Sequence, residues 1–308
     1  MPSFSNYSPG SYSHTIPIGA INVRYIVAAG VGGSSHTPGV GGGSGGFGRT
    51  GSFGIITRSY AYTLSFYTGA AGGNGVGPHN PGGSGGWSPI ASGGNGHRAG
   101  GGGGGASAVY DGGLNRYIGW LGGGGGAGRH GDDTSYGHPH YSAGRGVGGG
   151  STSGSPSWRS GGNAPAGHRG GGGGGSTAGG SGGLGGATTT NGYAGIGGNS
   201  GYWNGTGHIW YYPGYANWSN GYYTLSYEYG PPVIQYFTAT PTQLIKNSQN
   251  VNLSWSASGD INSVGISNVG SNLGNTGSTN VNPAYSTVYE LLVAGNGGTT
   301  TANQSITV

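Results

Sequence analysis

The residues best suited to chemistry gather in one glycine-flanked stretch, where three histidines surround two adjacent aspartates. They are His130, Asp132, Asp133, His138 and His140. Imidazole and carboxylate groups bind divalent metals, so the stretch is a candidate metal site. The alternative is a polar surface loop, because adjacent residues of an extended segment point to opposite faces. We favour the loop and expect no metal and no cofactor.

Other catalytic arrangements have little support. The chain has no cysteine, which excludes a disulfide scaffold and a cysteine-based metal site. Serine is abundant, but no Gly-x-Ser-x-Gly elbow stands between a predicted strand and a predicted helix. The glycine runs lack the Lys-Ser or Lys-Thr ending of a phosphate loop. We therefore expect a binding or structural protein and not an enzyme.

Aromatic residues are the more informative feature, with 22 Tyr and 7 Trp in a chain that is otherwise rich in glycine. Tyr, Trp and Arg give a large contact area for little lost entropy, while Ser, Gly and Asn adapt to a partner. Flat rings also suit the apolar faces of sugars. The alternative role is to cap a glycine core that has no side chains of its own. The candidate receptor-binding residues are Trp87, Tyr117, Trp120, Tyr136, His138, Tyr141, Trp158, Trp203, Trp210, Tyr211 and Trp218.

The densest aromatic cluster lies in the segment Tyr202–Tyr223. We expect this segment to form an ordered loop or hairpin. Trp210 and Trp218 would lie either at the receptor surface or over the glycine core.

Composition divides the chain near Gly230-Pro231-Pro232, since only eight of the 82 glycines follow residue 230. We predict a glycine-rich domain over residues 1–230 and a small all-β domain over residues 231–308. The glycines follow no strict Gly-X-Y period, which excludes collagen.

Strand signals enclose the glycine runs. Apolar and polar residues alternate over Ile21–Val27, Tyr60–Phe66 and Tyr223–Tyr229, as in half-buried strands. We expect these three segments to pair as one small sheet.

The glycine runs themselves, such as Gly100–Gly105 and Gly122–Gly126, have two readings. One is a flexible linker. The other is an ordered bundle of polyproline-II-like polyglycine helices, which pack closely because they have no side chains. We favour the bundle, because the runs recur within one region and strands enclose them.

After residue 230, short strands and turns about every ten residues predict a β-sandwich. Trp255 is expected in its core, facing the second sheet. The last two strands would be joined by Gly295–Gly298.

Charge is sparse, with 5% charged residues and a formal net charge of +4. No basic run supports nucleic-acid binding, and no apolar run approaches the roughly 20 residues of a membrane helix. The N-terminal MPSFSNYSPG lacks the pattern of a signal peptide, which favours assembly inside a host cell.

A resemblance follows from the order of these motifs. HTIPIGAINVRYIVAAGVGG, YAYTLSFYTGAAGG and NGYYTLSYEYG resemble the successive strands of glycine-rich domains in bacteriophage tail fibres and adhesins. Tyr67–Gly73 departs slightly from the family's second strand ending. The match covers about residues 11–230. It implies a glycine-helix bundle whose loops contact the host.

The C-terminal segment is similar to bacterial and phage immunoglobulin-like domains. The resemblance rests on PPVIQYFTATP and on Val251, Leu253 and Trp255 in VNLSWSA. It implies an immunoglobulin-like β-sandwich that adds a weak contact or joins the virion.

We therefore expect a virion structural protein of the tail fibre or tail tip that binds a host glycan or outer-membrane protein. The alternative is a capsid decoration protein with a weak adhesive role. An ice-binding protein is a third class, for which the cluster considered is the contiguous run Ala187–Thr190, which lacks a regular spacing of threonines. Expected partners are the host receptor and other virion proteins, with a homo-oligomer left open and no nucleic acid.

Overall fold

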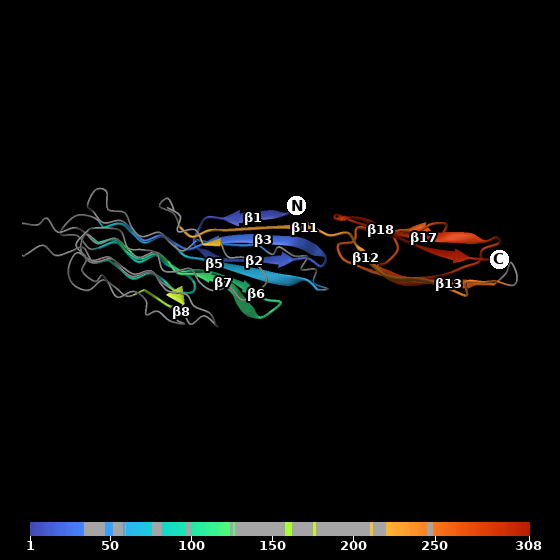
Figure 1. Ribbon diagram of the computed structural model, residues 1–308, viewed down its shortest axis with the longest axis horizontal. Coiled ribbons are helices and arrows are strands. Elements are labelled where there is room, and N and C mark those ends of the chain that lie inside the picture. Colours follow the sequence, from blue (N-terminus) through green and yellow to red (C-terminus); the bar gives the residue numbers. More distant parts are fainter. Residues whose placement is uncertain are drawn as a thin grey trace, which may run out of the picture.

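The computed structural model describes residues 1–33, 47–51, 58, 60–75, 82–96, 100–123, 126, 158–161, 175–176, 210–211, 220–244 and 249–308. Within these ranges the fold is all-β, with antiparallel sheets and no helix, which confirms the predicted class. The arrangement is elongated, with glycine-rich segments toward one end and the C-terminal strands at the other (Figure 1). None of these ranges contains a helix long and apolar enough to cross a membrane.

The first sheet has five antiparallel strands in the order β1-β11-β3-β4-β10. Its strands are β1 (Ser3–Asn6), β11 (Tyr223–Tyr229), β3 (Ala20–Ala28), β4 (Phe47–Gly51) and β10 (Trp210–Tyr211). Strands β3 and β11 pair as the sequence predicted, with Leu225 opposite Tyr25. A strand from the end of the glycine-rich part thus lies beside β3, which comes from near its start.

The second sheet has four antiparallel strands in the order β2-β5-β6-β7. Its strands are β2 (Gly10–Ile16), β5 (Tyr62–Thr68), β6 (Ser107–Asp111) and β7 (Arg116–Leu121). The prediction of one sheet for all three alternating segments is therefore wrong, because β5 pairs with β2 and not with β3 or β11. Alternation shows which face of a strand is buried, but it does not identify the neighbouring strand.

The two sheets share one hydrophobic core. Residues Leu64 and Phe66 of β5 pack in it with Tyr25 of β3 and Tyr223 and Leu225 of β11. The Phe66 and Tyr223 rings stack with their centroids 4.4 Å apart. This core holds the second sheet in place and leaves its opposite face directed outward.

The stretch YDGGLNRYIGW forms a hairpin of two paired strands. Strands β6 and β7 pair directly, with Tyr110 opposite Tyr117 and Ala108 opposite Trp120. A turn joins them, and Asn115 adopts a left-handed φ of 51° there. The hairpin matters for function because strands fix side chains more rigidly than a loop does.

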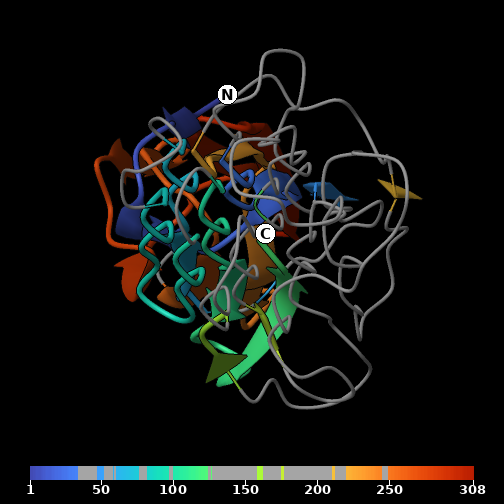
Figure 2. The same cartoon turned by 90° about the vertical axis from the view of Figure 1, so that its left-hand side faces the viewer.

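Glycine-rich segments continue from these sheets and lie side by side near the end that faces the viewer in Figure 2. Backbone hydrogen bonds link them at intervals of three residues. Gly30 and Gly33 donate to Gly105 and Gly102, and Gly102 and Gly105 donate to Gly73 and Ala70. With the same interval, Gly83 and Gly86 donate to Gly100 and Gly103. Gly93 and Gly96 in turn donate to Gly86 and Gly83.

Residues 100–106 occupy the centre of this packing, and all seven are buried. A Cβ atom added to Gly102 would lie 2.0 Å from the Ser84 oxygen, and one added to Gly104 would lie 2.0 Å from the Gly30 oxygen. Backbones at such distances leave no room for side chains. The glycine run is therefore required by close packing in this region.

The C-terminal part contains two further sheets. One has the order β12-β13-β16, from strands β12 (Val233–Thr240), β13 (Val251–Ser258) and β16 (Thr276–Val281). The other has the order β15-β14-β17-β18, from strands β15 (Gly270–Ser271), β14 (Ser263–Ile266), β17 (Thr287–Gly295) and β18 (Gly298–Ile306). Side chains from both sheets form a second core.

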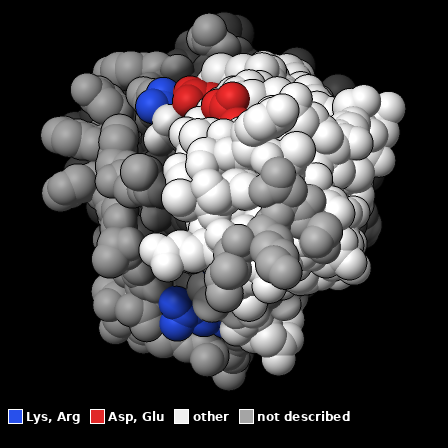
Figure 3. Space-filling view, turned by 90° about the vertical axis from the view of Figure 1, so that its right-hand side faces the viewer, with Lys and Arg blue, Asp and Glu red and all other residues white. Residues whose placement is uncertain are grey.

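Two predictions for this part are confirmed. Trp255 is buried in the shared core, and its indole N–H donates to the Gly274 carbonyl at 2.8 Å. Strands β17 and β18 form the final hairpin, closed where Gly295 pairs with Gly298. The described surface seen at this end carries few charged side chains (Figure 3).

His14 makes the stability of the first core dependent on pH. Its Nε2 atom lies 2.7 Å from the Tyr223 hydroxyl, and its ring lies against Phe4 and Phe66. Burial lowers the pKa of His14, so the folded state favours the neutral ring. Protonation is easier in the unfolded chain, whose histidine pKa is about 6.5. The free energy of unfolding should therefore fall as the pH drops below about 6.5.

Urea unfolding between pH 7.5 and 5 tests this expectation. The decline should be shallower for His14→Gln, since glutamine keeps a hydrogen-bonding partner for Tyr223 without titrating. The other eight histidines are present in both proteins and cancel in the comparison. Equal slopes for the two proteins would show that His14 does not cause the effect.

Candidate functional site

The hairpin β6–β7 places two tyrosines side by side. Tyr110 and Tyr117 are cross-strand partners, and their rings meet edge to face with centroids 5.2 Å apart. The Tyr110 hydroxyl donates to the Asn115 side chain at the turn. Such cross-strand ring pairs stabilise a hairpin and hold both rings in a defined orientation.

Trp158 extends this pair from a distant part of the sequence. It lies in β8 (Trp158–Arg159), which pairs with β9 (Gly175–Ser176). The Trp158 and Tyr117 ring centroids are 5.2 Å apart at 73°, and the Trp158 indole hydrogen-bonds the Tyr117 hydroxyl. Burial raises the pKa of Tyr117, and the bond from Trp158 opposes this effect. The phenol is therefore neutral at physiological pH.

Tyr67 completes what we call the aromatic cluster, defined as Tyr67, Tyr110, Tyr117 and Trp158. The Tyr67 and Tyr117 centroids are 6.1 Å apart. All four residues are partly exposed, and their strands come from three separate stretches of the chain. Partly exposed rings held by neighbouring rings and by a sheet form a preorganised contact surface.

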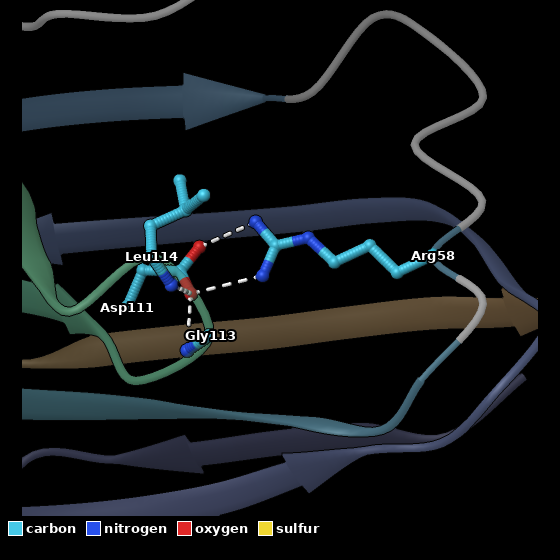
Figure 4. Close-up of polar contacts among 4 residues, drawn as sticks. All are labelled: Arg58, Asp111, Gly113 and Leu114. Carbon is cyan, nitrogen blue, oxygen red and sulfur yellow. Dashed lines mark hydrogen bonds and ion pairs between the residues drawn. The ribbon is translucent and has the colours of Figure 1, made fainter.

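An ion pair anchors the turn of the hairpin that carries this cluster (Figure 4). Arg58 donates to both oxygens of Asp111, at 3.0 and 2.7 Å, and both side chains are buried for the most part. The same carboxylate accepts the backbone N–H groups of Gly113 and Leu114. The hydrogen bond to Asp111 is the largest cause of the raised pKa of Arg58. The guanidinium also lies 3.8 Å from the Tyr62 ring centroid.

Among the predicted binding residues that the structure describes, Tyr117 and Trp158 are in contact with each other. Trp87 is 56% exposed, and its carbonyl accepts the Ala70 N–H beside a glycine segment. Trp120 lies in β7 opposite Ala108, and Trp210 and Tyr211 form β10 opposite Arg49 and Gly48.

The remaining predicted residues cannot be placed. Tyr136, His138, Tyr141, Trp203 and Trp218 lie outside the described ranges, as does most of Tyr202–Tyr223. The candidate metal ligands His130 to His140 also lie there. Among the residues that the structure describes, no cluster of three or more histidine or acidic side chains could hold a metal.

Sequence reasoning missed Tyr67 and Tyr110 as members of the cluster. A signal for Tyr67 was present, because it is out of phase with the inward-facing Tyr62, Leu64 and Phe66. Period-two alternation then directs Tyr67 to the outer face. Tyr110 could be found only after YDGGLNRYIGW is recognised as a hairpin.

No family model matches the chain, and no curated protein matches it significantly.

Proposed function

We propose that the chain is a receptor-binding structural protein of a bacteriophage tail fibre or tail tip, located on the virion. The aromatic cluster is the observation that carries this proposal. Two of its members, Tyr117 and Trp158, are residues whose type predicted a contact role, and both are partly exposed. In this proposal the protein binds its partners and catalyses no reaction. The partners are a host surface receptor and other virion proteins.

The glycine-rich part is proposed to be a bundle of polyglycine helices that displays this surface. A helix of the polyproline-II type has three residues per turn, so its bonding groups recur every third residue. The hydrogen bonds from Gly30 and Gly33 to Gly105 and Gly102 have this interval. Ordering so many glycines is entropically costly, and the mutual backbone bonds offset that cost.

The C-terminal part is proposed to be an immunoglobulin-like sandwich. In support, a three-stranded and a four-stranded sheet contribute to one core around Trp255. Such a unit would connect the attachment domain to the virion or add a second weak contact.

Truncating the aromatic cluster tests the attachment role. Binding anchors commonly cost about 2 kcal/mol or more when they are truncated. Tyr117→Ala with Trp158→Ala should therefore weaken binding to susceptible host cells by about 30-fold or more. Binding of fluorescent protein to cells measures this effect, and thermal unfolding confirms that the variant is folded.

Tyr285→Ala is the matched control, since Tyr285 is 81% exposed in the C-terminal part. It should bind as the unmodified protein does. Equal binding by the folded cluster variant would contradict the assigned surface. Antibody labelling of the capsid lattice, with no label on the tail, would contradict the tail location and favour a capsid decoration protein.

A further inference from the structure

The outer face of the second sheet presents an array of hydroxyl groups beside the aromatic cluster. Strands β2 and β5 supply it as cross-strand pairs. Ser13 lies opposite Ser65, Thr15 lies opposite Thr63, and Ser11 lies opposite Tyr67. The β2 members are exposed and the β5 members are partly exposed. The neighbouring inward positions of β5, Leu64 and Phe66, are buried in the core.

The hydroxyl array is continuous with the rings. Ser65 is also the cross-strand partner of Tyr110, and Tyr67 is the partner of Ala108. A path across the sheet therefore runs from Ser13 through Ser65 to Tyr110 and Tyr117. With about 4.8 Å between strands, three strand spacings cover roughly 14 Å. This is enough for a short oligosaccharide.

The chemistry of this face favours one class of ligand. Hydroxyl groups both donate and accept hydrogen bonds, as the Ser13 and Ser65 oxygens do at 2.9 Å. Aromatic faces pack against the apolar C–H surfaces of sugar rings. No charged residue contributes to the hydroxyl array, and exposed Arg116 lies at the turn end of β7 beside the cluster. Among the described residues of this face, no row of cations is present for an anionic polymer.

We propose that this face binds a neutral oligosaccharide laid from β2 across to the aromatic cluster. The proposal rests on the proposed attachment function and assigns its ligand class and its surface. The hydroxyl array hydrogen-bonds the sugar hydroxyls, and the rings of Tyr67, Tyr110, Tyr117 and Trp158 contact the sugar faces. Because uncharged groups make the contacts, affinity should depend little on salt.

The test measures binding of the full chain to sensor surfaces coated with neutral glucan, mannan or galactan, and with polygalacturonate as an anionic comparison. Binding to at least one neutral polymer is expected, with less than a twofold change between 50 and 500 mM NaCl. Ser13→Lys and Tyr67→Ala should each weaken it at least tenfold. Ser13 is exposed on an edge strand, so its variant is expected to fold.

Ser278→Lys is a closely matched control. Ser278 is exposed on edge strand β16 and lies opposite Ser254, as Ser13 lies opposite Ser65. It should leave binding unchanged. Binding to polygalacturonate alone, no binding to any neutral polymer, or equal losses in Ser13→Lys and Ser278→Lys would each overturn the proposal.

Host-cell binding separates this inference from the proposed function. Cell binding that depends on Tyr117 and Trp158, without any binding to neutral polymers, would reject the sugar ligand and keep the attachment role. Ser13-dependent binding to a neutral polymer, without binding to susceptible cells, would keep the sugar site and reject attachment.

Discussion

Replacing Gly104 with alanine should destabilise the glycine-rich part severely. The new Cβ atom would lie 2.0 Å from the Gly30 oxygen and 2.7 Å from the Val31 oxygen. Both are backbone atoms, so no side-chain rotation relieves the overlap. Gly104 is also flanked by residues that bond neighbouring segments, since Gly103 donates to Gly94 and Gly105 donates to Ala70. Moving one segment away would break bonds on several sides.

Overpacking a well-packed interior costs about 1–3 kcal/mol and sometimes more. A backbone-to-backbone overlap belongs at the upper end, so we expect a loss of about 3 kcal/mol or more. For a region of this size, the unfolding temperature should fall by about 6–12 °C. Scanning calorimetry of the full chain measures this fall, and the C-terminal transition serves as an internal reference.

Gly119→Ala is the matched control for this substitution. Gly119 lies in β7, and apart from its chain neighbours no described residue has an atom within 4 Å of the position its Cβ would take. Its replacement should change the free energy of unfolding by about 0.5 kcal/mol or less. Similar effects of the two substitutions would show that glycine is not required by contact at Gly104.

The sequence allowed the class of fold to be predicted because the core strands alternate clearly. Tyr223, Leu225 and Tyr227 are buried at every second position of β11, and the final hairpin has glycines where its strands meet. The burial of Trp255 followed from the same pattern. Each of these features is encoded within a few neighbouring residues.

The arrangement of sheets could not be predicted in the same way. Strand β2 reads GSYSHTI, in which only Ile16 is a fully apolar side chain, so its pairing with β5 was not evident. The packing of β5 in a second sheet depends on contacts with β3 and β11 that are distant in sequence. Local alternation carries no information about such contacts.

The sequence predicted the types of residue in the candidate site, but not which particular residues form it. Tyr117 and Trp158 were predicted as binding residues because they are aromatic residues among small ones. Their contact joins two residues that are 41 positions apart in the sequence. The hydroxyl array was missed because Ser and Thr are common throughout the chain. Only the register of β2 with β5 shows that Ser13 and Ser65 form a shared surface.

Replacing Asp111 with alanine should cause the second large loss of stability. Asp111 is 3% exposed and Arg58 is 13% exposed, so removing the carboxylate leaves a guanidinium largely buried without its partner. Breaking one side of a buried ion pair costs about 3–5 kcal/mol. The N–H groups of Gly113 and Leu114 also lose their acceptor. We therefore expect a loss of at least about 3 kcal/mol, measured by urea unfolding.

Two further variants separate the charge from the turn. Asp111→Asn retains an oxygen for the N–H groups of Gly113 and Leu114 but leaves Arg58 without an anion. Adding Arg58→Met removes the buried cation while an apolar chain still covers the Tyr62 ring. Replacing a buried ion pair by apolar groups is often neutral, so the double variant should recover most of the stability lost in Asp111→Asn. If the double variant is no more stable than Asp111→Asn, the buried charge is not the cause. The turn contacts of Asp111 would then explain its role in holding Tyr110 and Tyr117 together.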